Sequence, residues 1–352
     1  MINILKIILS PLLLVYWLIV TTRNVFFDKG IFNHTKVDAK VISVGNITVG
    51  GSGKTPTVIL VTKILKEVGI KTGILSRGYS RNSKGYQLVS DGKTDMMPVN
   101  LSGDEIYLAA EECGVPAAVS ERRVKGSQKF IADTNVEAIV LDDAFQHRWI
   151  DRDLNILVFD HRFLTKRRTL DRTLLPLGRM RETFSAIDRA NVIIINRKFT
   201  KKVEIPKNIL KLFEGKNLFY GFYRSSGLYD VKNQQYFDLN EFEGEKSLVV
   251  CGIARPYSFL RVLETNNVDI SNKILFKDHK EYKLKEIDLI RKKFYETNSN
   301  SVVTTQKDFV KLKSFSKELD DIDIYYLKID MEIENEDKFK NQILELFNKQ
   351  NN

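Results

Sequence analysis

The 352-residue sequence has few of the residues that mark disulfide-bonded or metal-centred proteins. Its two cysteines, Cys113 and Cys251, form no Cys-x-x-Cys pair, so neither a disulfide framework nor a zinc site is indicated. Four histidines are too few and too scattered for a metal cluster. Internal repeats and low-complexity tracts are also missing. The composition therefore fits a reducing cytosolic environment.

Acidic residues are in the minority, with 45 Asp and Glu against 55 Lys and Arg, which gives a net charge of +10. This balance suggests an anionic partner, which can be nucleic acid, an acidic lipid surface or a phosphorylated substrate. No basic stripe with interleaved aromatic residues stands out, so we expect no nucleic acid. The length and a hydrophobic content of 43% indicate a globular protein of two domains.

The most informative stretch is Val41–Thr55, in which an apolar run ends in a glycine-rich loop. This is the strand–loop–helix order of a phosphate-binding P-loop, because glycines let backbone N–H groups turn inward around anionic oxygens. Lys54 is expected to reach the β- and γ-phosphates, and Thr55 to ligate Mg²⁺. Thr48 replaces the first glycine of the motif, and a glycine-rich turn without nucleotide is the alternative. The predicted nucleotide-binding residues are Thr48, Val49, Gly50, Gly51, Ser52, Gly53, Lys54 and Thr55.

The N-terminal segment is the most apolar part of the chain and is uncharged from Ile7 to Val20. That run is shorter than the roughly 20 residues of a spanning helix, although residues 1–22 would reach about 33 Å as a helix. A signal peptide, a spanning helix, an interfacial anchor and a buried core helix all fit the pattern. No A-x-A-like cleavage site is present. We therefore expect a retained membrane anchor of undefined depth.

Apolar strand patterns alternate with helical patterns along the rest of the chain. Buried strands are predicted at Val41–Val44, Thr72–Leu75, Glu137–Leu141, Leu154–Phe159 and Asn191–Asn196. This alternation predicts an α/β, P-loop NTPase-like fold with a mostly parallel sheet and helices on both faces. Ligands bind beyond the carboxyl ends of the strands in such sheets.

A second α/β pattern begins near Lys246, without a second P-loop. Before it, Asn217–Phe237 is typical of a strand pair with Ser225–Gly227 as the turn. We therefore expect a membrane-anchor helix at 1–22 and a P-loop domain at 23–215. Linker strands and a smaller C-terminal α/β domain are expected at 216–352.

Two carboxylates, Asp142 and Asp143, follow a buried strand and have the placement of a Walker B acid, which holds Mg²⁺ opposite the P-loop. A solvated strand-end turn is the alternative. Gln146, a few residues on, is either structural or bonded to a sugar or phosphate. Asp104 precedes a helical pattern, so it is either an N-cap or a base that accepts the proton of an attacking hydroxyl.

The stretch 162–181 carries seven Lys and Arg residues against one acid, Asp171. Near a nucleotide site such a stretch can bind an anionic substrate or stabilise the charge on a transferring phosphoryl group. A solvated charge run is the alternative. The residues alone leave both interpretations open.

The chain resembles the tetraacyldisaccharide 4′-kinase family, the lipid A 4′-kinases of Gram-negative bacteria, over nearly its full length. The resemblance rests on ordered blocks: the apolar N-terminus, VGNITVGGSGKTP, SRGY, SGDE, LDDAFQHR, LLPLGRMRE, FKDH and TTQKD. Ile106 stands where the family usually has Pro, and Ala144 where Gly is frequent. Neither substitution removes a reactive group, and Thr48 is a family feature.

The resemblance implies an enzyme on the cytoplasmic face of the bacterial inner membrane. It implies transfer of the γ-phosphate of ATP, with Mg²⁺, to the 4′-hydroxyl of a lipid-linked glucosamine disaccharide 1-phosphate. The membrane surface is an implied partner, and the oligomeric state is left open. By motif, the implied catalytic residues are Asp104, His279, Lys54 and Arg181. The implied metal residues are Thr55, Asp143, Asp142 and Glu182, and the implied substrate residues are Ser76, Arg77, Tyr79 and Gln146.

Three other functions are compatible with parts of the sequence. Thr305–Asp308 faintly matches the guanine-selecting pattern of P-loop GTPases, so a membrane-associated GTPase or ATPase switch is one alternative. A partitioning-type ATPase would need a lysine where Val49 stands. A lipid-surface binding protein with a degenerate loop would not need Lys54, Thr55 and Asp143 intact.

Overall fold

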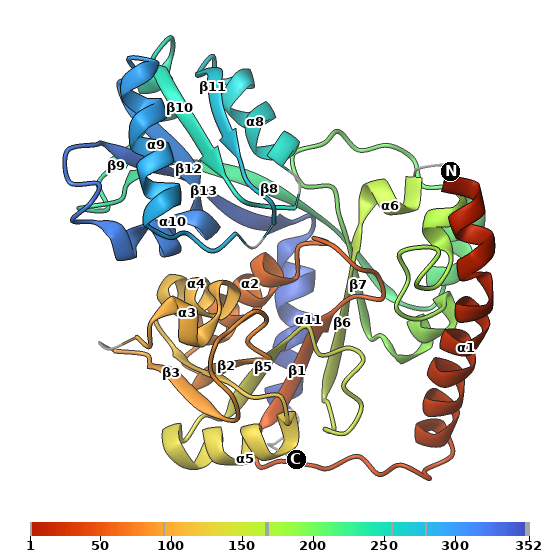
Figure 1. Ribbon diagram of the computed structural model, residues 1–352. Coiled ribbons are helices and arrows are strands. Elements are labelled where there is room, and N and C mark those ends of the chain that lie inside the picture. Colours follow the sequence, from red (N-terminus) through yellow and green to blue (C-terminus); the bar gives the residue numbers. More distant parts are fainter. Residues whose placement is uncertain (1, 94–95, 166–168, 255, 279, 349–352) are drawn as a thin grey trace.

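The computed structural model describes residues 2–93, 96–165, 169–254, 256–278 and 280–348. Within these ranges the strands join into one sheet that runs through the molecule (Figure 1). They are β1 (Lys40–Gly45), β2 (Thr72–Ser76), β3 (Gln87–Asp91), β4 (Pro116–Val119), β5 (Ala138–Asp142), β6 (Leu154–Asp160), β7 (Val192–Asn196), β8 (Asn217–Asp230), β9 (Tyr236–Phe237), β10 (Lys246–Cys251), β11 (Asp269–Leu275), β12 (Ser301–Thr305) and β13 (Ile324–Ile333).

The strand order is β11-β10-β12-β13-β8-β7-β6-β1-β5-β2-β4-β3, and β9 pairs with β8. Neighbours run parallel except in three antiparallel pairs, β13–β8, β3–β4 and β8–β9. The predicted mostly parallel α/β sheet is confirmed. The antiparallel edge strand β3 was not predicted.

The strand pair predicted at Asn217–Phe237 is present as β8 and β9, but the turn predicted at Ser225–Gly227 is wrong, because β8 runs on to Asp230. It continues through Ser225–Gly227 because it pairs first with β7 and then along β13. The turn lies beyond Asp230, whose Oδ1 accepts hydrogen bonds from the backbone N–H groups of Lys232 and Asn233. One continuous strand therefore connects the two halves of the sheet.

Helices cover both faces of the sheet. They are α1 (Ile2–Asp28), α2 (Lys54–Glu67), α3 (Val99–Ser102), α4 (Asp104–Cys113), α5 (Arg123–Thr134), α6 (His161–Thr165), α7 (Lys207–Leu210), α8 (Pro256–Thr265), α9 (Leu284–Glu296), α10 (Gln306–Leu312) and α11 (Glu336–Asn348). Successive strand residues point to opposite faces. In β1, Ile42 packs in the core that includes α2, α4 and α11, and Val41 packs in the core that includes α5.

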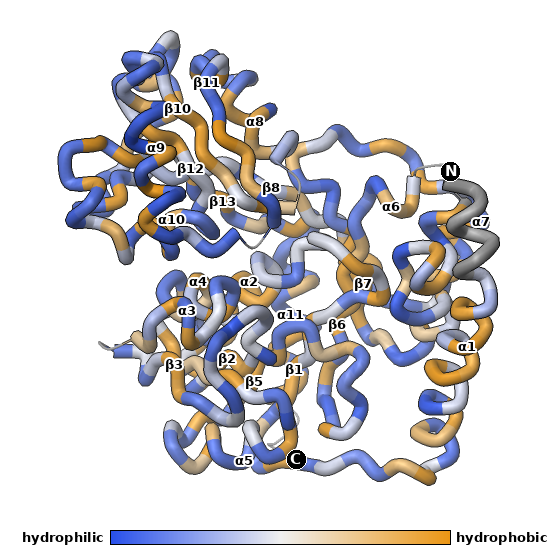
Figure 2. Tube along the Cα trace, viewed as in Figure 1, coloured by the Kyte–Doolittle hydropathy of each residue, from blue (hydrophilic) through white to orange (hydrophobic). Residues whose placement is uncertain are grey.

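The C-terminal strands repeat this arrangement on a smaller scale. Val249 of β10 packs in a core with α8, and its neighbours Leu248 and Val250 pack in a core with α9. Figure 2 shows β10 as mostly hydrophobic along its length, as a strand buried on both faces should be. The last helix, α11, does not stay with this half, because Phe339 and Ile343 pack in the core of α2 and β1.

Helix α1 lies along one side of the molecule (Figure 1). Leu13 and Tyr16 pack against the core beside β6 and β7. Only 11% of the window Ser10–Asp28 is buried, although this segment is long and apolar enough to cross a membrane. The helix therefore is not the buried core helix that the sequence also allowed, and it extends six residues beyond the predicted 1–22.

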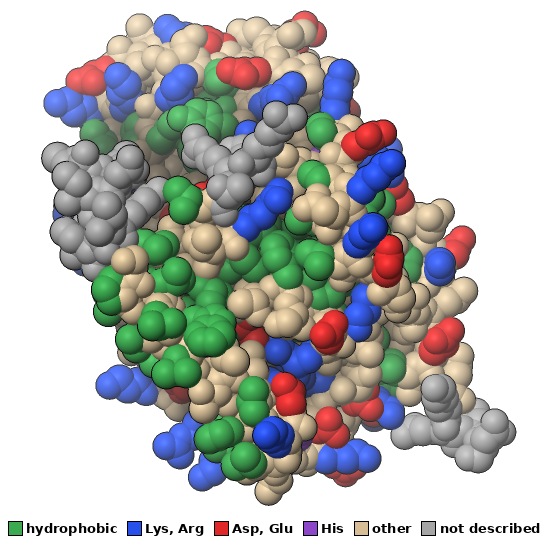
Figure 3. All heavy atoms as spheres, turned by 90° about the vertical axis from the view of Figure 1, so that its right-hand side faces the viewer, with side chains coloured by type: hydrophobic (Ala, Val, Ile, Leu, Met, Phe, Trp, Pro, Cys, Tyr) green, Lys and Arg blue, Asp and Glu red, His purple; other side chains and the backbone are tan. Residues whose placement is uncertain are grey.

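An apolar surface remains on the outer side of α1. Figure 3 shows hydrophobic side chains gathered on this side of the molecule, with Lys and Arg around them. Its exposed residues include Leu12, Leu14, Val15, Trp17, Leu18 and Ile19.

Candidate active site

The glycine-rich loop lies between the end of β1 and the start of α2. Gly50 and Gly53 have φ of +97° and +104°, a left-handed conformation that favours glycine. A Cβ on Gly53 would lie 2.1 Å from the amide nitrogen of Asn196, so no side chain fits there. Helix α2 begins at Lys54 and directs its N-terminus at the loop. The local geometry is therefore that of a phosphate-binding loop.

Residues at and just after the end of β7 hydrogen-bond to the backbone of the glycine-rich loop. The Asn196 amide nitrogen donates to the carbonyl oxygen of Ser52 at 3.1 Å. The Lys198 ammonium donates to the carbonyl oxygen of Gly51 at 2.7 Å and pairs with the buried Asp160 at 3.0 Å. The sequence prediction missed Asn196 and Lys198. The carboxyl end of a buried strand was the signal that could have found Asn196.

Two arginines of the basic stretch 162–181 also reach the site. Arg179 donates from its guanidinium to the Val49 carbonyl oxygen at 2.9 Å, and its own carbonyl accepts from the Val49 N–H at 2.8 Å. Arg181 lines the cavity beside the loop. These two side chains are therefore part of the site and not of a solvated charge run.

A cavity of about 1030 Å³ lies beside the loop and opens between the two halves of the sheet. Its walls include Tyr16 and Arg23 of α1, and Phe259 and Lys307 of the C-terminal half. Most of the predicted site residues line it: Val49, Gly50, Gly51, Ser52, Gly53, Lys54, Thr55, Ser76, Arg77, Tyr79, Asp142, Asp143, Gln146 and Arg181. Thr48, Asp104 and Glu182 lie outside this lining, and His279 lies outside the described residues.

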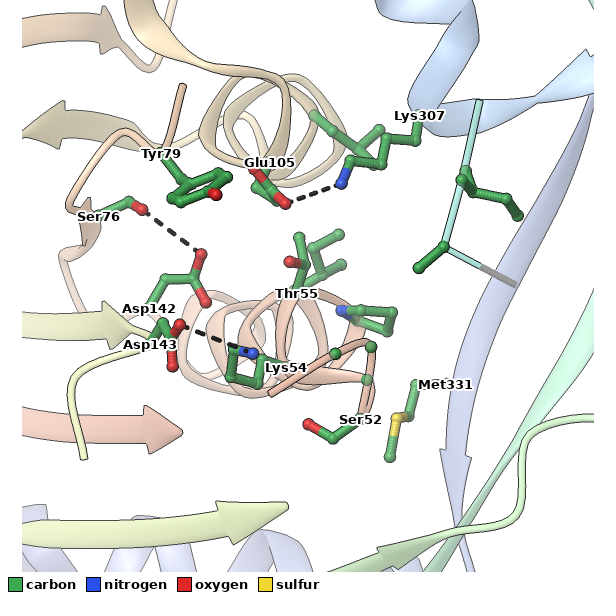
Figure 4. A pocket seen from close by; sticks show the side chains of 18 of the residues that line it. Ser52, Lys54, Thr55, Ser76, Tyr79, Glu105, Asp142, Asp143, Lys307 and Met331 are labelled. Carbon is green, nitrogen blue, oxygen red and sulfur yellow. Dashed lines mark hydrogen bonds and ion pairs between the residues drawn. The ribbon is translucent and has the colours of Figure 1, made fainter. Parts of the chain in front are cut away.

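Asp142 ends β5 with its side chain directed into the cavity (Figure 4). Its Oδ2 lies 3.5 Å from the Ser76 hydroxyl, and its Oδ1 is buried without a hydrogen-bond partner among the described residues. Burial and the neighbouring Asp143 raise the pKa of Asp142 to about 6. A cation bound at this carboxylate would therefore stabilise its ionised form.

Asp143 is paired with two cations. It adopts φ of 48°, and Arg181 Nη1 lies 2.9 and 3.0 Å from its two carboxylate oxygens. The Lys54 ammonium lies 3.7 Å from the same carboxylate (Figure 4). The P-loop lysine, the arginine and the strand-end acid therefore meet at one point.

The donor set fits a hard divalent cation. Mg²⁺ prefers oxygen ligands, and the buried Oδ1 of Asp142 and the Thr55 hydroxyl are oxygens on the same cavity. Within the described ranges, no group of three or more His, Cys, Asp and Glu side chains is arranged to hold a metal by itself. Protein sites for Mg²⁺ usually take remaining ligands from water and substrate phosphates.

Glu182 is held elsewhere. Its buried carboxylate pairs with Arg189 at 2.8 Å and accepts a hydrogen bond from Asn24 of α1 at 2.7 Å. The Tyr16 hydroxyl donates to the Arg181 carbonyl oxygen at 3.0 Å, one residue earlier. In this structure Glu182 therefore fastens α1 to the site and is not grouped with Thr55 and Asp142.

Asp104 is the first residue of α4, because Gly103 occupies the N-cap position. The N-cap interpretation of Asp104 is therefore wrong. Its nearly buried carboxylate lies 3.1 Å from the Lys311 ammonium and 3.6 Å from that of Lys307. The next residue, Glu105, lines the cavity and pairs with Lys307 at 2.8 Å.

The predicted substrate residue Gln146 lies beside Arg181, whose Nη1 donates to its side-chain oxygen at 3.5 Å. The Gln146 amide nitrogen donates to the Asn46 carbonyl oxygen at 2.8 Å. His147 beside it is neutral near pH 7, because burial and nearby arginines lower its pKa to about 4. Arg123 also lines the cavity and donates to the Asp142 carbonyl oxygen at 3.3 Å. The sequence prediction missed Arg123, because a single arginine at the start of a helix belongs to no recognisable motif.

Comparison with known proteins gives a consistent result. The sequence model of the family described as tetraacyldisaccharide-1-P 4′-kinase matches residues 5–348. A tetraacyldisaccharide 4′-kinase of Syntrophus aciditrophicus is 31% identical over 339 residues, 93% of this chain and 89% of that protein. The enzyme of the same name from Chlorobaculum tepidum is 37% identical over 314 residues, 87% of this chain and 86% of that protein.

A solved structure is similar over the same extent. It is described as the "apo" form of LpxK from Aquifex aeolicus in complex with ATP, and it shares 30% sequence identity with this chain. The match covers 97% of this chain and 99% of that one, with a TM-score of 0.77.

Proposed function

This chain belongs to the tetraacyldisaccharide-1-P 4′-kinase family, and from that membership we propose how the residues around its P-loop perform the family's reaction. The chain is an ATP-dependent kinase of lipid A biosynthesis. It transfers the γ-phosphate of ATP to the 4′-hydroxyl of a tetraacyldisaccharide 1-phosphate. The family match over residues 5–348 is the observation that carries this conclusion.

The GTPase alternative loses its main support in the structure. Thr305 caps α10, and its hydroxyl donates to the Asp308 carboxylate at 2.7 Å. Asp308 is fully buried and also accepts from the Gly252 N–H at 2.9 Å. These contacts explain the guanine-like pattern as helix capping and loop anchoring.

Backbone N–H groups of the loop and the Lys54 ammonium would hold the β- and γ-phosphates of ATP. The residues proposed to surround the nucleotide are Thr48, Val49, Gly50, Gly51, Ser52, Gly53, Lys54 and Thr55. When ATP binds, Lys54 and Arg181 would leave the Asp143 carboxylate and contact phosphate oxygens instead. Arg181 would then stabilise the negative charge that develops on the transferring group.

Thr55, Asp142 and Asp143 would hold Mg²⁺. When bound, the ion would neutralise charge on the β- and γ-phosphates. The unpartnered buried oxygen of Asp142 supports this assignment, because a cation would compensate a carboxylate that burial disfavours.

Asp104 is the proposed general base. It would accept the proton of the 4′-hydroxyl as the oxygen attacks the γ-phosphorus, with His279 in support by the family resemblance. In this structure the carboxylate is turned toward α10. The next residue along α4, Glu105, lines the cavity, so Asp104 lies directly beside it.

The lipid would enter from the side of α1. Ser76, Arg77, Tyr79 and Gln146 would contact the sugar and phosphate of the substrate. The exposed apolar face of α1, beside a cavity that Tyr16 and Arg23 help to line, supports attachment to the cytoplasmic face of the inner membrane. Segment 1–22 would act as the anchor, 23–215 as the P-loop domain, and 216–352 as the linker and C-terminal domain, with α11 packed back on the P-loop domain.

Transfer of label tests the proposed reaction. The protein is incubated with γ-labelled ATP and a purified tetraacyldisaccharide 1-phosphate in detergent micelles. Label should appear in the lipid, and none in an acceptor whose 4′-hydroxyl is blocked. Release of labelled inorganic phosphate at the same rate with either acceptor would contradict the proposal.

A further inference from the structure

Two lysines of α10 meet the proposed base at the junction of the two halves of the sheet. Lys311 contributes the shorter contact, 3.1 Å to Asp104 Oδ2, and Lys307 lies at 3.6 Å from the same oxygen. The side chains of Lys311 and Asp104 are 11% and 6% exposed. An ion pair this far from water is poorly screened, so removing one partner leaves a buried charge uncompensated.

Lys311 is itself fixed by the C-terminal half. Its ammonium lies 3.9 Å from Asp308 Oδ1 and 3.3 Å from the Lys280 carbonyl oxygen. Asp308 cannot move freely, because it accepts hydrogen bonds from the Gly252 N–H and from the hydroxyls of Tyr282 and Thr305. A continuous chain of polar contacts therefore runs from Asp104 through Lys311 to the loops of the C-terminal half.

The docking of α10 on α4 does not rest on these charges alone. Phe309, Val310 and Tyr326 form an apolar cluster against Tyr107 and Leu108 of α4. The Phe309 and Tyr326 rings stack with centroids 4.3 Å apart. Loss of one ammonium should therefore leave the helix in place, which separates a role in positioning from a role in folding.

We propose that Lys311, assisted by Lys307, is a positioning residue for phosphoryl transfer, which holds the Asp104 carboxylate ionised and oriented from the opposite half of the molecule. The inference rests on the proposed role of Asp104 as base. It gives the TTQKD block a function, because Thr305 and Asp308 of that block fix the helix that carries both lysines. Asp104, which lies in the P-loop half, can then act as the base only while the C-terminal half is docked on it.

The charged groups around Asp104 determine the expected pH behaviour. On α4 the neighbouring charge is Glu105, which pairs with Lys307. From α10, two lysines face Asp104, namely Lys307 and Lys311, and Asp308 lies beside Lys311. Asp278 lies near Lys307. A nearby positive charge favours the ionised form of a carboxylate. Loss of Lys311 should therefore make Asp104 harder to ionise.

The test compares Lys311→Met and Lys307→Met with a matched control, Lys313→Met. Lys313 follows α10 and pairs with Glu111 of α4 at 2.9 Å, but it does not contact Asp104. The pH profile of kcat and the KM for ATP are measured for each full-length variant. For Lys311→Met we expect the acid limb to move up by about one pH unit, with kcat on that limb reduced by up to about tenfold.

Further results expected from the same experiment define the role. The activity of Lys311→Met should recover at high pH, its KM for ATP should stay within about twofold, and Lys307→Met should shift the limb less. Lys311→Arg keeps the charge and should shift the limb less than Lys311→Met. Lys313→Met should match the unchanged protein.

A Lys311→Met profile that superimposes on that of Lys313→Met would overturn the inference, as would a loss of equal size at every pH. Asp104→Asn, assayed in parallel, separates the two ideas. If Asp104→Asn turns over normally, the base assignment fails. If it is inactive while Lys311→Met behaves like the control, only the positioning role fails.

Discussion

Arg181 approaches Asp143 with a single nitrogen, Nη1, which lies 2.9 Å from one carboxylate oxygen and 3.0 Å from the other. Lys54 lies on the same carboxylate at 3.7 Å. Three residues far apart in the sequence thus form one charge cluster where ATP phosphates are expected. The two cations are held on a protein carboxylate and would be transferred to phosphate oxygens on binding.

Arg181→Ala should lower kcat by about 10²- to 10³-fold, because removing a donor that stabilises transition-state charge has effects of this size. The affinity for ATP should change much less, since Lys54 and the loop remain. Arg224→Ala is the matched control, because Arg224 pairs with Glu332 on the surface. Steady-state kinetics and calorimetric ATP binding check both. Equal losses in kcat and in ATP affinity would contradict a role confined to the transition state.

Asp142→Asn should raise the stability of the ion-free protein at pH 8. The folded pKa of Asp142, about 6, lies above the ordinary value, so ionisation opposes folding. This cost is absent below about pH 4, grows as pH rises from about 4 to 6, and is complete above that range. Removing it should stabilise the protein by roughly 1–3 kcal/mol at pH 8 and by much less near pH 4.

Thermal unfolding in EDTA at the two pH values measures this gain. The control is Asp323→Asn, an exposed carboxylate beside Lys232. The same Asp142→Asn protein should lose activity with Mg²⁺ and ATP. A Tm gain of equal size at pH 8 and pH 4 would show that ionisation of Asp142 is not the cause.

Asn196→Ala should weaken ATP binding through the loop. The variant loses the hydrogen bond to the Ser52 carbonyl, which is worth about 1 kcal/mol, so KM for ATP should rise about fivefold or more. Asn217→Ala serves as control, because its amide bonds Gln342 of α11. An unchanged KM for ATP in Asn196→Ala would mean that the loop keeps its shape without this brace.

The apolar face of α1 should determine membrane attachment. Deleting residues 1–22 would also remove Tyr16, which lines the cavity, so substitution is the cleaner test. The triple variant Leu14→Gln, Trp17→Gln, Leu18→Gln should sediment less with anionic lipid vesicles. It should keep its activity on a micellar substrate.

The control for this experiment changes three exposed apolar residues elsewhere, in the triple variant Val203→Gln, Leu212→Gln, Leu284→Gln. Its sedimentation should match that of the unchanged protein. If both triple variants bind vesicles normally, the attachment lies in another part of the chain.

The P-loop half was readable from the sequence because its signals are local. A strand, a glycine-rich loop, Lys54 and Thr55 follow each other within 15 residues, and Asp142 ends an apolar run. The predicted strands agree with β1, β2, β5, β6 and β7 to within about two residues. Side-chain alternation and strand-end placement then brought most of the candidate residues to one cavity.

What the sequence could not supply depends on contacts between distant residues. Gly227 looks like a turn, and its φ is +102°, but it lies at a register shift in the pairing with β13, and β8 continues beyond it. The approach of Lys311 to Asp104 joins positions 207 residues apart, and no local pattern marks it. The return of α11 to the core of α2 has the same cause, because an amphipathic helix does not reveal which surface it covers.

In the proposed mechanism, Asp104 accepts the proton of the attacking 4′-hydroxyl. The most direct test measures label transfer from γ-labelled ATP to the disaccharide lipid by Asp104→Asn, alongside calorimetric ATP binding. We expect transfer to fall by at least about 10²-fold while ATP binding remains near that of the unchanged protein. Near-normal transfer by Asp104→Asn would contradict the role of Asp104 as the base.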